Sequence, residues 1–241
     1  MSMTGLSDIG LRREVNQDAF LVTERLWAVA DGVGGGPGGE VAAAIAIDAI
    51  GRGAGSAHTA ADLEHLAVHA AADVHEAARR DPALAGMATT LTAALLTYEG
   101  LAVVHAGDSR LYRLRRGAIE QLTEDHAFVP QLVRQGLLTP ERAASHPLRN
   151  VLTRALGADP DVDYQQLLID VAPGDVFLLC TDGLTKMVAE DRIAAIVGAA
   201  PTLDAATHAL VDAANSAGGY DNVTVVLGST APPAATVAAA A

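Results

Sequence analysis

The stretch TTLTAALLTYEGLAVVHAGDSRLYRLRRGAIEQL, Thr89–Leu122, decides the fold class of this 241-residue chain. It consists of short apolar runs separated by turn signals at Glu99-Gly100, Gly107-Asp108 and Arg116-Gly117. Apolar runs of this length with a glycine turn after each are typical of strands joined as hairpins. The stretch therefore predicts an antiparallel meander, with strands at Thr89–Tyr98, Leu101–His105, Arg110–Leu114 and Ile119–Leu122.

Strands and helices are expected in separate groups on either side of this stretch. Further strands are indicated at Leu26–Ala30, Tyr164–Ile169, Val176–Cys180 and Val223–Leu227. Helices are indicated at Glu40–Ile50, Thr59–Arg80, His126–Gly136, Thr139–Ala144 and Leu203–Ala214. Because strands come in hairpin runs and helices in pairs, this order favours antiparallel sheets covered by helices over alternating βαβ units. The sequence thus predicts an α+β fold with two stacked sheets and helix layers outside them.

Composition limits the possible function classes. The net charge of −13 disfavours nucleic-acid binding, because nucleic-acid-binding surfaces are basic. The single cysteine, Cys180, lies in an apolar run and fits a reducing compartment. Met1–Gly10 does not have the pattern of a signal peptide, and no apolar run reaches the length of a membrane span. We expect a cytoplasmic monomer with no nucleic-acid or membrane partner.

The chain is expected to form one domain followed by a short tail. Its length suits a single large domain, and its composition is even until the last dozen residues. Residues 229–241 are rich in Ala, Pro and Thr and carry no charge. We therefore predict a disordered tail over these residues.

Five acidic segments lie at or beside the ends of apolar, strand-like runs: Arg13–Asp18, Asp31–Gly35, Gly107–Arg110, Thr181–Gly183 and Gly218–Asn222. Asp carboxylates are hard oxygen donors that suit Mg²⁺ or Mn²⁺, and no Cys/His cluster competes with them. Two adjacent metals need a bridging carboxylate and several terminal ones, a set that Asp31, Asp182 and Asp221 could supply. With Arg13 available for an anion, the pattern points to metal-assisted phosphoester hydrolysis.

Each segment also has a simpler interpretation. A lone Asp beside Gly is common in turns and helix caps, and an exposed arginine is usually only solvated. Gly34, Gly36 and Gly39 also satisfy the dinucleotide-binding pattern G-x-G-x-x-G. That alternative is disfavoured, because the element after the next helix is another helix and because Pro37 removes a backbone donor from the loop.

Taken together, the segments resemble the metal-dependent protein serine/threonine phosphatases of type 2C, or PPM phosphatases, in their short bacterial form. The resemblance extends from Ser7-Asp8-Ile9-Gly10 to Asp221-Asn222-Val223-Thr224, and the order and spacing of the motifs make it specific. It implies a PPM-type catalytic domain over residues 1–228. The implied architecture is a four-layer αββα sandwich, with two antiparallel sheets packed face to face, helix pairs on both outer faces and metals at one end.

The resemblance also implies an activity. A water that bridges two Mn²⁺ or Mg²⁺ ions would become hydroxide near neutral pH and attack the phosphorus of phosphoserine or phosphothreonine. We expect phosphoprotein substrates and a role opposite bacterial Ser/Thr kinases. A catalytically weak phosphoprotein-binding regulator and a small-molecule phosphoesterase with the same metal centre are the alternatives.

Carried over by position, the resemblance gives five residues a role as metal ligands. Asp31 would bridge the two ions, and Gly32 would ligate through its carbonyl. Asp182 and Asp221 would complete the first site. Asp108, together with Asp182, would form a third, weaker metal site.

Other residues would act on water and substrate. Asp18 would order metal-bound waters, Arg13 would hold the phosphoryl group and Asn222 would position water. The segment Asp125–Asn150 corresponds to a mobile flap near the substrate entrance. His105, inside an apolar strand, is expected to be a hydrogen-bonded core histidine rather than a ligand.

Four positions depart from the family pattern. Gln17 stands where many members have Glu, and Ala88 adds a methyl group where Gly is usual. Val33 stands where animal members carry His, and Gly36 stands where bacterial members commonly carry His. The general acid is therefore not identified by the motifs. We expect a metal-bound water, or His146 from the flap, to protonate the leaving group.

Overall fold

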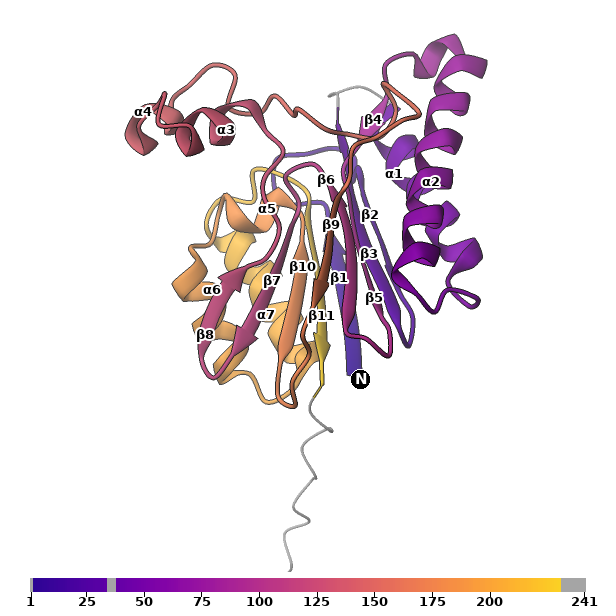
Figure 1. Cartoon of the computed structure of the whole chain (residues 1–241). Helices are drawn as coiled ribbons and strands as arrows, with labels where there is room; N and C mark the ends of the chain where they lie inside the picture. Colours follow the sequence, from indigo (N-terminus) through magenta and orange to yellow (C-terminus); the bar gives the residue numbers. More distant parts are fainter. Residues whose placement is uncertain (1, 34–37, 231–241) are drawn as a thin grey trace, which may run out of the picture.

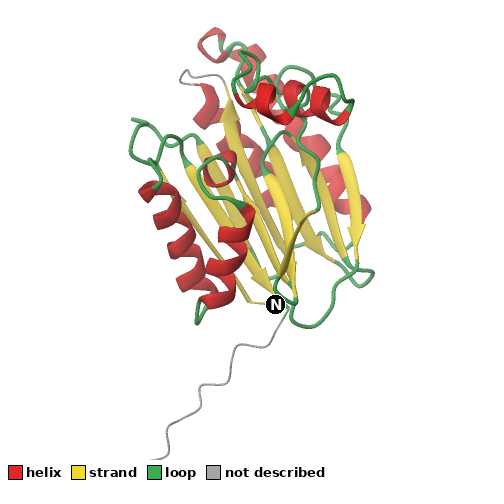
Figure 2. Cartoon of the chain, turned by 90° about the vertical axis from the view of Figure 1, so that its left-hand side faces the viewer, coloured by secondary structure: helices red, strands yellow, loops and turns green. Residues whose placement is uncertain are grey.

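Two antiparallel β-sheets pack face to face in the centre of the molecule, and helices cover both outer faces (Figures 1 and 2). The structure is a computed structural model that describes residues 2–33 and 38–230. Its layers follow the order helices, sheet, sheet, helices. The predicted α+β class and four-layer αββα architecture are therefore confirmed.

Each sheet combines hairpins of consecutive strands with strands that are distant in the sequence. The first sheet has the order β1-β11-β10-β7-β8, and its strands are β1 (Ser2–Asp8), β7 (Arg110–Arg115), β8 (Ala118–Gln121), β10 (Val176–Cys180) and β11 (Val223–Ser229). The second has the order β2-β3-β5-β6-β9, and its strands are β2 (Asp18–Val22), β3 (Leu26–Val33), β5 (Leu91–Leu96), β6 (Leu101–Ala106) and β9 (Gln165–Ile169). The short β4 (Ala88–Thr89) pairs with the end of β3.

Helices cover the sheets in pairs. Helices α1 and α2 pack on the second sheet, and α6 and α7 pack on the first (Figure 1). Helices α3 and α4 project from one end of the sandwich. The helix bounds are α1 (Gly38–Gly53), α2 (Ala60–Arg80), η1 (Pro82–Leu84), α3 (Phe128–Arg134), α4 (Pro140–Ala144), α5 (Asp182–Thr185), α6 (Glu190–Ala199) and α7 (Leu203–Ser216).

Side-chain alternation along the strands fills the space on both sides of each sheet. Trp27 and Val29 of β3 meet Phe177 and Leu179 of β10 between the two sheets, where all four are fully buried. The intervening Leu178 points the other way and packs under α6 and α7. The inner strands are apolar on both faces for this reason, which explains their continuous apolar runs in the sequence.

The predicted continuous meander over Thr89–Leu122 was wrong at one turn. Strands β5 and β6 form a hairpin in the second sheet, whereas β7 and β8 form a hairpin in the first. The chain crosses between the sheets at Gly107, whose φ is +120°. A Cβ atom there would lie 2.5 Å from Thr90 Cβ, so glycine permits the close crossing. Since β9 already pairs with the free edge of β6, β7 has to pair elsewhere.

Helix α2 confirms its predicted bounds, whereas β1, β2, α5 and α6 were not predicted. Thr59 caps α2 in a reciprocal capping box with Asp62. Strands β1 and β2 lie at sheet edges and are only partly buried, so their apolar alternation is weak. Helix α5 is a single turn, too short to show periodicity.

The predicted tail differs from the structure at its first residues. Ser229 belongs to β11 and pairs with Ser2 and Val176. The N–H of Thr230 donates to the carbonyl of Asp175. The rest of the predicted tail lies outside the described residues. In the part of the chain that the structure describes, every helix is too short or too polar to cross a bilayer.

His105 of β6 is a hydrogen-bonded core residue, as the sequence predicted. Its Nε2–H donates to the carbonyl of Glu124 at 3.0 Å, and its Nδ1 bonds the hydroxyl of Thr92 at 2.8 Å. The ring stacks on that of His126, with 4.7 Å between ring centroids. Burial lowers the pKa of His105 from 6.5 to about 4, so the ring stays neutral in the folded protein.

Truncating the inter-sheet core tests the packing. Leu179→Ala removes a fully buried side chain between the sheets, and we expect the free energy of unfolding to fall by about 2–5 kcal/mol. Leu168→Ala removes the same atoms from a side chain that is 56% exposed on β9, and we expect a much smaller loss. Urea denaturation measures both. Equal losses would contradict the proposed packing between the sheets.

The buried His105 also predicts how stability depends on pH. Between pH 7 and 5 the unfolded chain gains a proton at this histidine, whose ordinary pKa is 6.5, whereas the folded chain does not. Stability is therefore lost as the pH falls, by about 2 kcal/mol at pH 5 from His105 alone. We expect His105→Gln to reduce this loss in urea denaturation at the two pH values. The exposed His69→Gln on α2 is the control, and an unchanged loss in His105→Gln would refute the prediction.

Candidate metal centre

Two aspartates meet at one end of the sandwich because their strands are neighbours. Asp18 begins β2, Asp31 lies near the end of β3, and the antiparallel register sets them opposite each other. Asp31 has the same alternation as Trp27 and Val29, whose side chains lie between the sheets. The strand pattern therefore directs Asp31 toward the inner side of the sandwich, at its edge.

Three more aspartates reach this end from distant parts of the sequence. Asp108 lies in the crossing between β6 and β7, Asp182 begins α5 directly after β10, and Asp221 precedes β11. Together with Asp31 they line one narrow cavity of about 120 Å³. The other residues that line this cavity are Arg13, Gln17, Gly32, Val33, Asn150, Leu152 and Lys186.

Two glycines of the predicted motifs allow the surrounding loops to close on the cavity. A Cβ atom on Gly32 would lie 2.2 Å from the carbonyl oxygen of Gly39. A Cβ atom on Gly183 would lie 1.9 Å from the carbonyl oxygen of Asn222. Any side chain at either position would force the backbone apart, so both glycines are required by sterics.

The aspartates are crowded enough to change one another's protonation. Burial, and then the charges of Asp182, Asp18 and Asp108, raise the pKa of Asp31 well above its ordinary value. Burial, and then Asp182, raise the pKa of Asp108 to about 7. Burial likewise raises the pKa of Asp18 to about 7, against two hydrogen bonds that lower it. The cavity therefore favours a cation that would neutralise these carboxylates.

Unsatisfied oxygens show that the residues fit a divalent cation. The Oδ1 atoms of Asp18 and Asp182 are buried without a hydrogen-bond partner. Within residues 2–33 and 38–230, no three ligand-type side chains are already clustered as a ready-made metal site. Asp182 pairs with Lys186 and Asp221 pairs with Arg13, which draws both carboxylates toward cationic side chains. The donors are nonetheless all oxygens, the set that Mn²⁺ and Mg²⁺ prefer.

Asp18 and Arg13 take different places around this cavity. Asp18 Oδ2 accepts hydrogen bonds from the hydroxyls of Thr181 at 2.8 Å and Thr224 at 2.7 Å, so Asp18 is fixed beneath the cavity. Arg13 lines the cavity and donates from Nη2 to Asp221 Oδ2 at 2.8 Å. Its guanidinium is 42% exposed and remains accessible to an anion.

Asn222, which the sequence predicts to position water, is hydrogen-bonded to the backbone of the N-terminal loop. Its Nδ2 donates to the carbonyls of Ile9 and Val15, at 2.9 and 3.0 Å. Its Oδ1 accepts from the N–H of Gln17 at 2.9 Å. The buried amide thus holds the loop that carries Arg13, and it does not line the cavity.

His146 is not brought into the cavity. Its Nδ1 accepts from the N–H of Leu148 at 3.1 Å, within a turn of the flap. A catalytic role for His146 stays a prediction that this geometry does not support. Of the two positions that lack the family's histidine, Val33 lines the cavity and Gly36 lies outside the described residues.

Three cavity residues were not singled out from the sequence. Asn150 is the last residue of the predicted flap, Leu152 lies two residues beyond it, and Lys186 follows α5. Asn150 and Leu152 carry no local signal, because only the fold places them opposite the aspartates. Lys186 did carry a signal in the sequence, because it is the only lysine of the chain.

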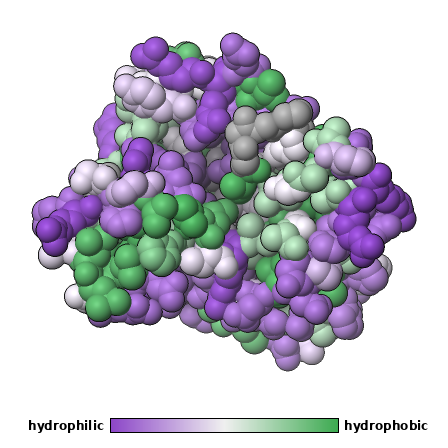
Figure 3. Space-filling model, turned by 90° about the horizontal axis from the view of Figure 1, so that it is seen from above, coloured by the Kyte–Doolittle hydropathy of each residue, from purple (hydrophilic) through white to green (hydrophobic). Residues whose placement is uncertain are grey.

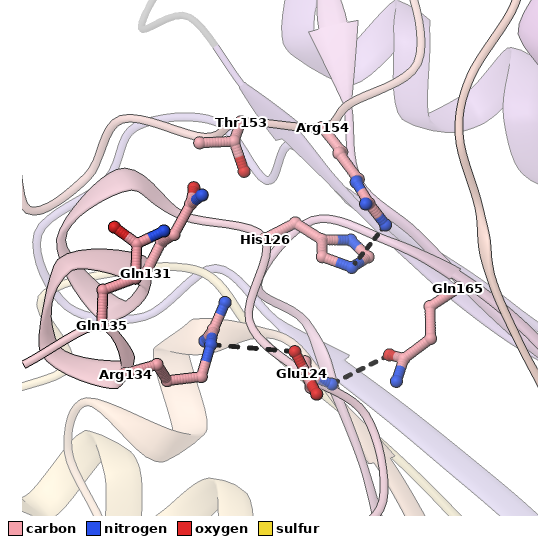
Figure 4. A pocket seen from close by; sticks show the side chains of 8 residues that line it. All are labelled: Glu124, His126, Gln131, Arg134, Gln135, Thr153, Arg154 and Gln165. Atoms are coloured by element: carbon pink, nitrogen blue, oxygen red, sulfur yellow. Dashed lines mark hydrogen bonds and ion pairs between the residues drawn. The ribbon is translucent and has the colours of Figure 1, made fainter.

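A second, larger cavity of about 560 Å³ lies beside α3 and is shown in Figure 4. Arg154 donates there to His126 Nε2 at 3.1 Å and pairs with Asp163 at 2.6 Å. Leu152 lines the aspartate cavity and Thr153 lines this one, so adjacent residues of one segment line the two cavities. None of the site residues predicted from the sequence lines the larger cavity, and the smaller one is therefore the candidate site.

Known proteins share both the sequence and the fold. Residues 11–217 match the family described as protein phosphatase 2C. Serine/threonine protein phosphatase PstP of Mycobacterium tuberculosis is 38% identical over 224 residues, which are 92% of this chain and 43% of that protein. Serine/threonine phosphatase stp of Listeria monocytogenes is 35% identical over 233 residues and 92% of each chain. This chain thus spans less than half of the mycobacterial relative and most of the Listeria one.

A solved structure of similar fold contains manganese. The catalytic domain of PstP in complex with two manganese ions aligns with a TM-score of 0.84 at 36% identity, covering 94% of this chain and 96% of that one. The aspartate cavity and the sandwich that carries it agree with this similarity. The chain belongs to the protein phosphatase 2C family.

Proposed function

We propose that this protein is a metal-dependent phosphatase that hydrolyses phosphoserine and phosphothreonine in proteins. The observation that carries the proposal is the cavity in which Asp31, Asp108, Asp182 and Asp221 gather beside Arg13. These residues come from four separate segments, and their mutual repulsion would be costly without a cation to bind. Family membership and the two manganese ions in the PstP structure support the same reading.

Different residues of the cavity would have different roles in such a site. Asp31, Asp182, Asp221 and the carbonyl of Gly32 would hold two Mn²⁺ or Mg²⁺ ions, with Asp18 fixed behind them. The ions, when bound, supply Lewis-acid stabilisation of the phosphoryl oxygens and a nucleophile generated from water.

Arg13 is the group that would orient the substrate. Its guanidinium can donate two parallel hydrogen bonds to phosphoryl oxygens, and the buried amide of Asn222 fixes the loop that carries it. The Asp221 pairing holds the guanidinium at the cavity and raises the pKa of Arg13 through their hydrogen bond, so the charge is permanent. As negative charge moves onto the phosphoryl oxygens, this fixed donor stabilises the transition state.

The size of the cavity favours a protein substrate. Small-molecule sites usually enclose about 300–1,000 Å³, whereas this cavity of about 120 Å³ has room for little more than the phosphoryl group. Exposed Leu11 and Val15 flank Arg13 in the sequence, and exposed Leu148 and Val151 flank Asn150. Figure 3 views this end and shows apolar patches among polar side chains. A polypeptide could lie on such a rim while its phosphate enters the cavity.

The finer parts of the proposal concern partners, state and location. We infer that the substrates are products of bacterial Ser/Thr kinases and that the protein acts as a cytoplasmic monomer. The leaving alkoxide needs a proton, which we assign to water in the cavity, because His146 lies outside the lining residues. The alternative of a phosphoprotein-binding regulator predicts peptide binding without turnover.

Asp31→Asn tests the proposed function directly, because it removes one charge with little change of shape. We expect the wild type to release phosphate from a phosphothreonine peptide with Mn²⁺ or Mg²⁺ and not with EDTA, and we expect Asp31→Asn to lose this release. Asp48→Asn, an exposed residue on α1, is the matched control and should keep full activity. Turnover by Asp31→Asn at the wild-type rate would refute the assignment, and binding without turnover in the wild type would favour the regulator.

Arg13→Met tests the phosphoryl contact. Loss of a fixed donor to the transition state should lower kcat/KM by about 10²–10³-fold. The neighbouring Arg12 does not line the cavity and lies over the Tyr220 ring at 5.6 Å, so Arg12→Met is the control. Steady-state kinetics with one phosphopeptide compares the two variants, and equal effects would show that only general positive charge matters.

A further inference from the structure

Lys186 has an unusual place in both the sequence and the structure. Among the 16 basic Lys and Arg residues of the chain it is the one lysine, so every other cationic position is arginine. This one ammonium lies in the wall of the aspartate cavity. A chain that otherwise uses arginine places its single compact cation where the carboxylates converge.

Local helical geometry fixes the ammonium against Asp182. The backbone N–H of Lys186 donates to the carbonyl of Asp182 at 2.9 Å, which closes one turn at α5. The side chains are thereby set on the same face, and Lys186 Nζ forms an ion pair with Asp182 Oδ2. The Asp182 carboxylate is only 13% exposed, whereas the Lys186 side chain is 42% exposed, so water screens this pair in part.

The ammonium also shares its cavity with the second carboxylate of the expected third metal site. Lys186, Asp108 and Asp182 all line this one cavity of about 120 Å³. A lysine ammonium carries a full positive charge at neutral pH. The charge that is paired with Asp182 therefore lies in the same small space as Asp108.

A lysine suits this place better than an arginine. The ammonium is a compact point charge with three donors, whereas a guanidinium is a broad planar fork. A compact charge can lie between carboxylates in the way a bound ion does. It would also repel any divalent ion that approached the same two side chains.

We propose that the Lys186 ammonium takes the position beside Asp108 and Asp182 that a third divalent ion would need, so that the cavity holds two divalent ions and no third. The inference rests on the metal centre of the proposed function. It adds that the Lys186 ammonium, rather than a third metal ion, neutralises the carboxylates of Asp108 and Asp182. Asp108 then serves as a partner of Lys186 rather than as a metal ligand.

Counting bound Mn²⁺ tests the inference without measuring activity. Electron paramagnetic resonance of free Mn²⁺ at equilibrium should give two bound equivalents for the wild type. Lys186→Met keeps the length of the side chain and removes the charge, and it should bind a third equivalent more weakly. Asp108→Asn in the Lys186→Met background should return the count to two, because it removes a ligand of the new site.

Two controls show whether the bound-ion count depends on the positive charge at position 186 rather than on the lysine side chain itself or on the net charge of the protein. Lys186→Arg keeps a charge and should stay at two equivalents. Arg192→Met removes one exposed positive charge from α6 and should also stay at two. A third equivalent in the wild type, or its absence in Lys186→Met, would overturn the inference.

A second measurement needs no substitution. Because Lys186 is the only lysine, mass spectrometry can measure the rate at which an amine reagent acetylates this one side chain. The acetylation rate should be the same with two equivalents of Mn²⁺ and with an excess. A several-fold rise in excess Mn²⁺ would mean that a third ion displaces the ammonium and would overturn the inference.

Fewer than two bound ions in the wild type would overturn both this inference and the metal centre. Two ions without phosphate release would overturn the phosphatase alone.

Discussion

The crowding of buried carboxylates at one end of the sandwich is the constraint on which the rest of this structure depends. Burial raises the pKa of Asp18 and Asp108 from 3.8 to about 7. Between these values the folded protein retains protons that the unfolded chain has released, so this contribution to stability falls as the pH rises toward neutrality. The site is therefore a local source of instability near neutral pH. Hydroxyls of Thr181 and Thr224 and the cations Arg13 and Lys186 offset part of the repulsion.

A rigid frame holds the carboxylates together in spite of this repulsion. The inter-sheet core around Trp27, Phe177 and Leu179 fixes the ends of β3 and β10, from which Asp31 and Asp182 project. Asn222 adds three hydrogen bonds that join the loop carrying Arg13 to the start of β11. Side chains that do no chemistry thus set the spacing of those that do, because fixed charges act strongly only if they cannot move apart.

The crossing at Gly107 explains how one cavity can draw on both sheets. In a meander confined to one sheet, Asp108 would lie in a turn at the edge of that sheet alone. The crossing instead places it between the two sheets, near Asp31 of one and Asp182 of the other. Asn150 and Leu152, from the segment that follows α4, line the cavity on another side. The small volume that results supports the proposal of a phosphoprotein substrate.

The sequence by itself determined the local features of this protein. Helix α2 could be predicted between its Thr59 cap and Asp81-Pro82, β10 could be predicted residue by residue, and the aspartates beside glycines indicated a metal centre, because each of these signals lies within a few residues. The tertiary structure decided the rest. Contacts between distant segments decide which sheet β7 joins and that the Asn222 amide bonds the backbone of the loop that carries Arg13. They also keep His146 out of the cavity and bring Lys186 into it. No local pattern encodes such contacts, since they arise only when the two sheets pack and bring strand ends together.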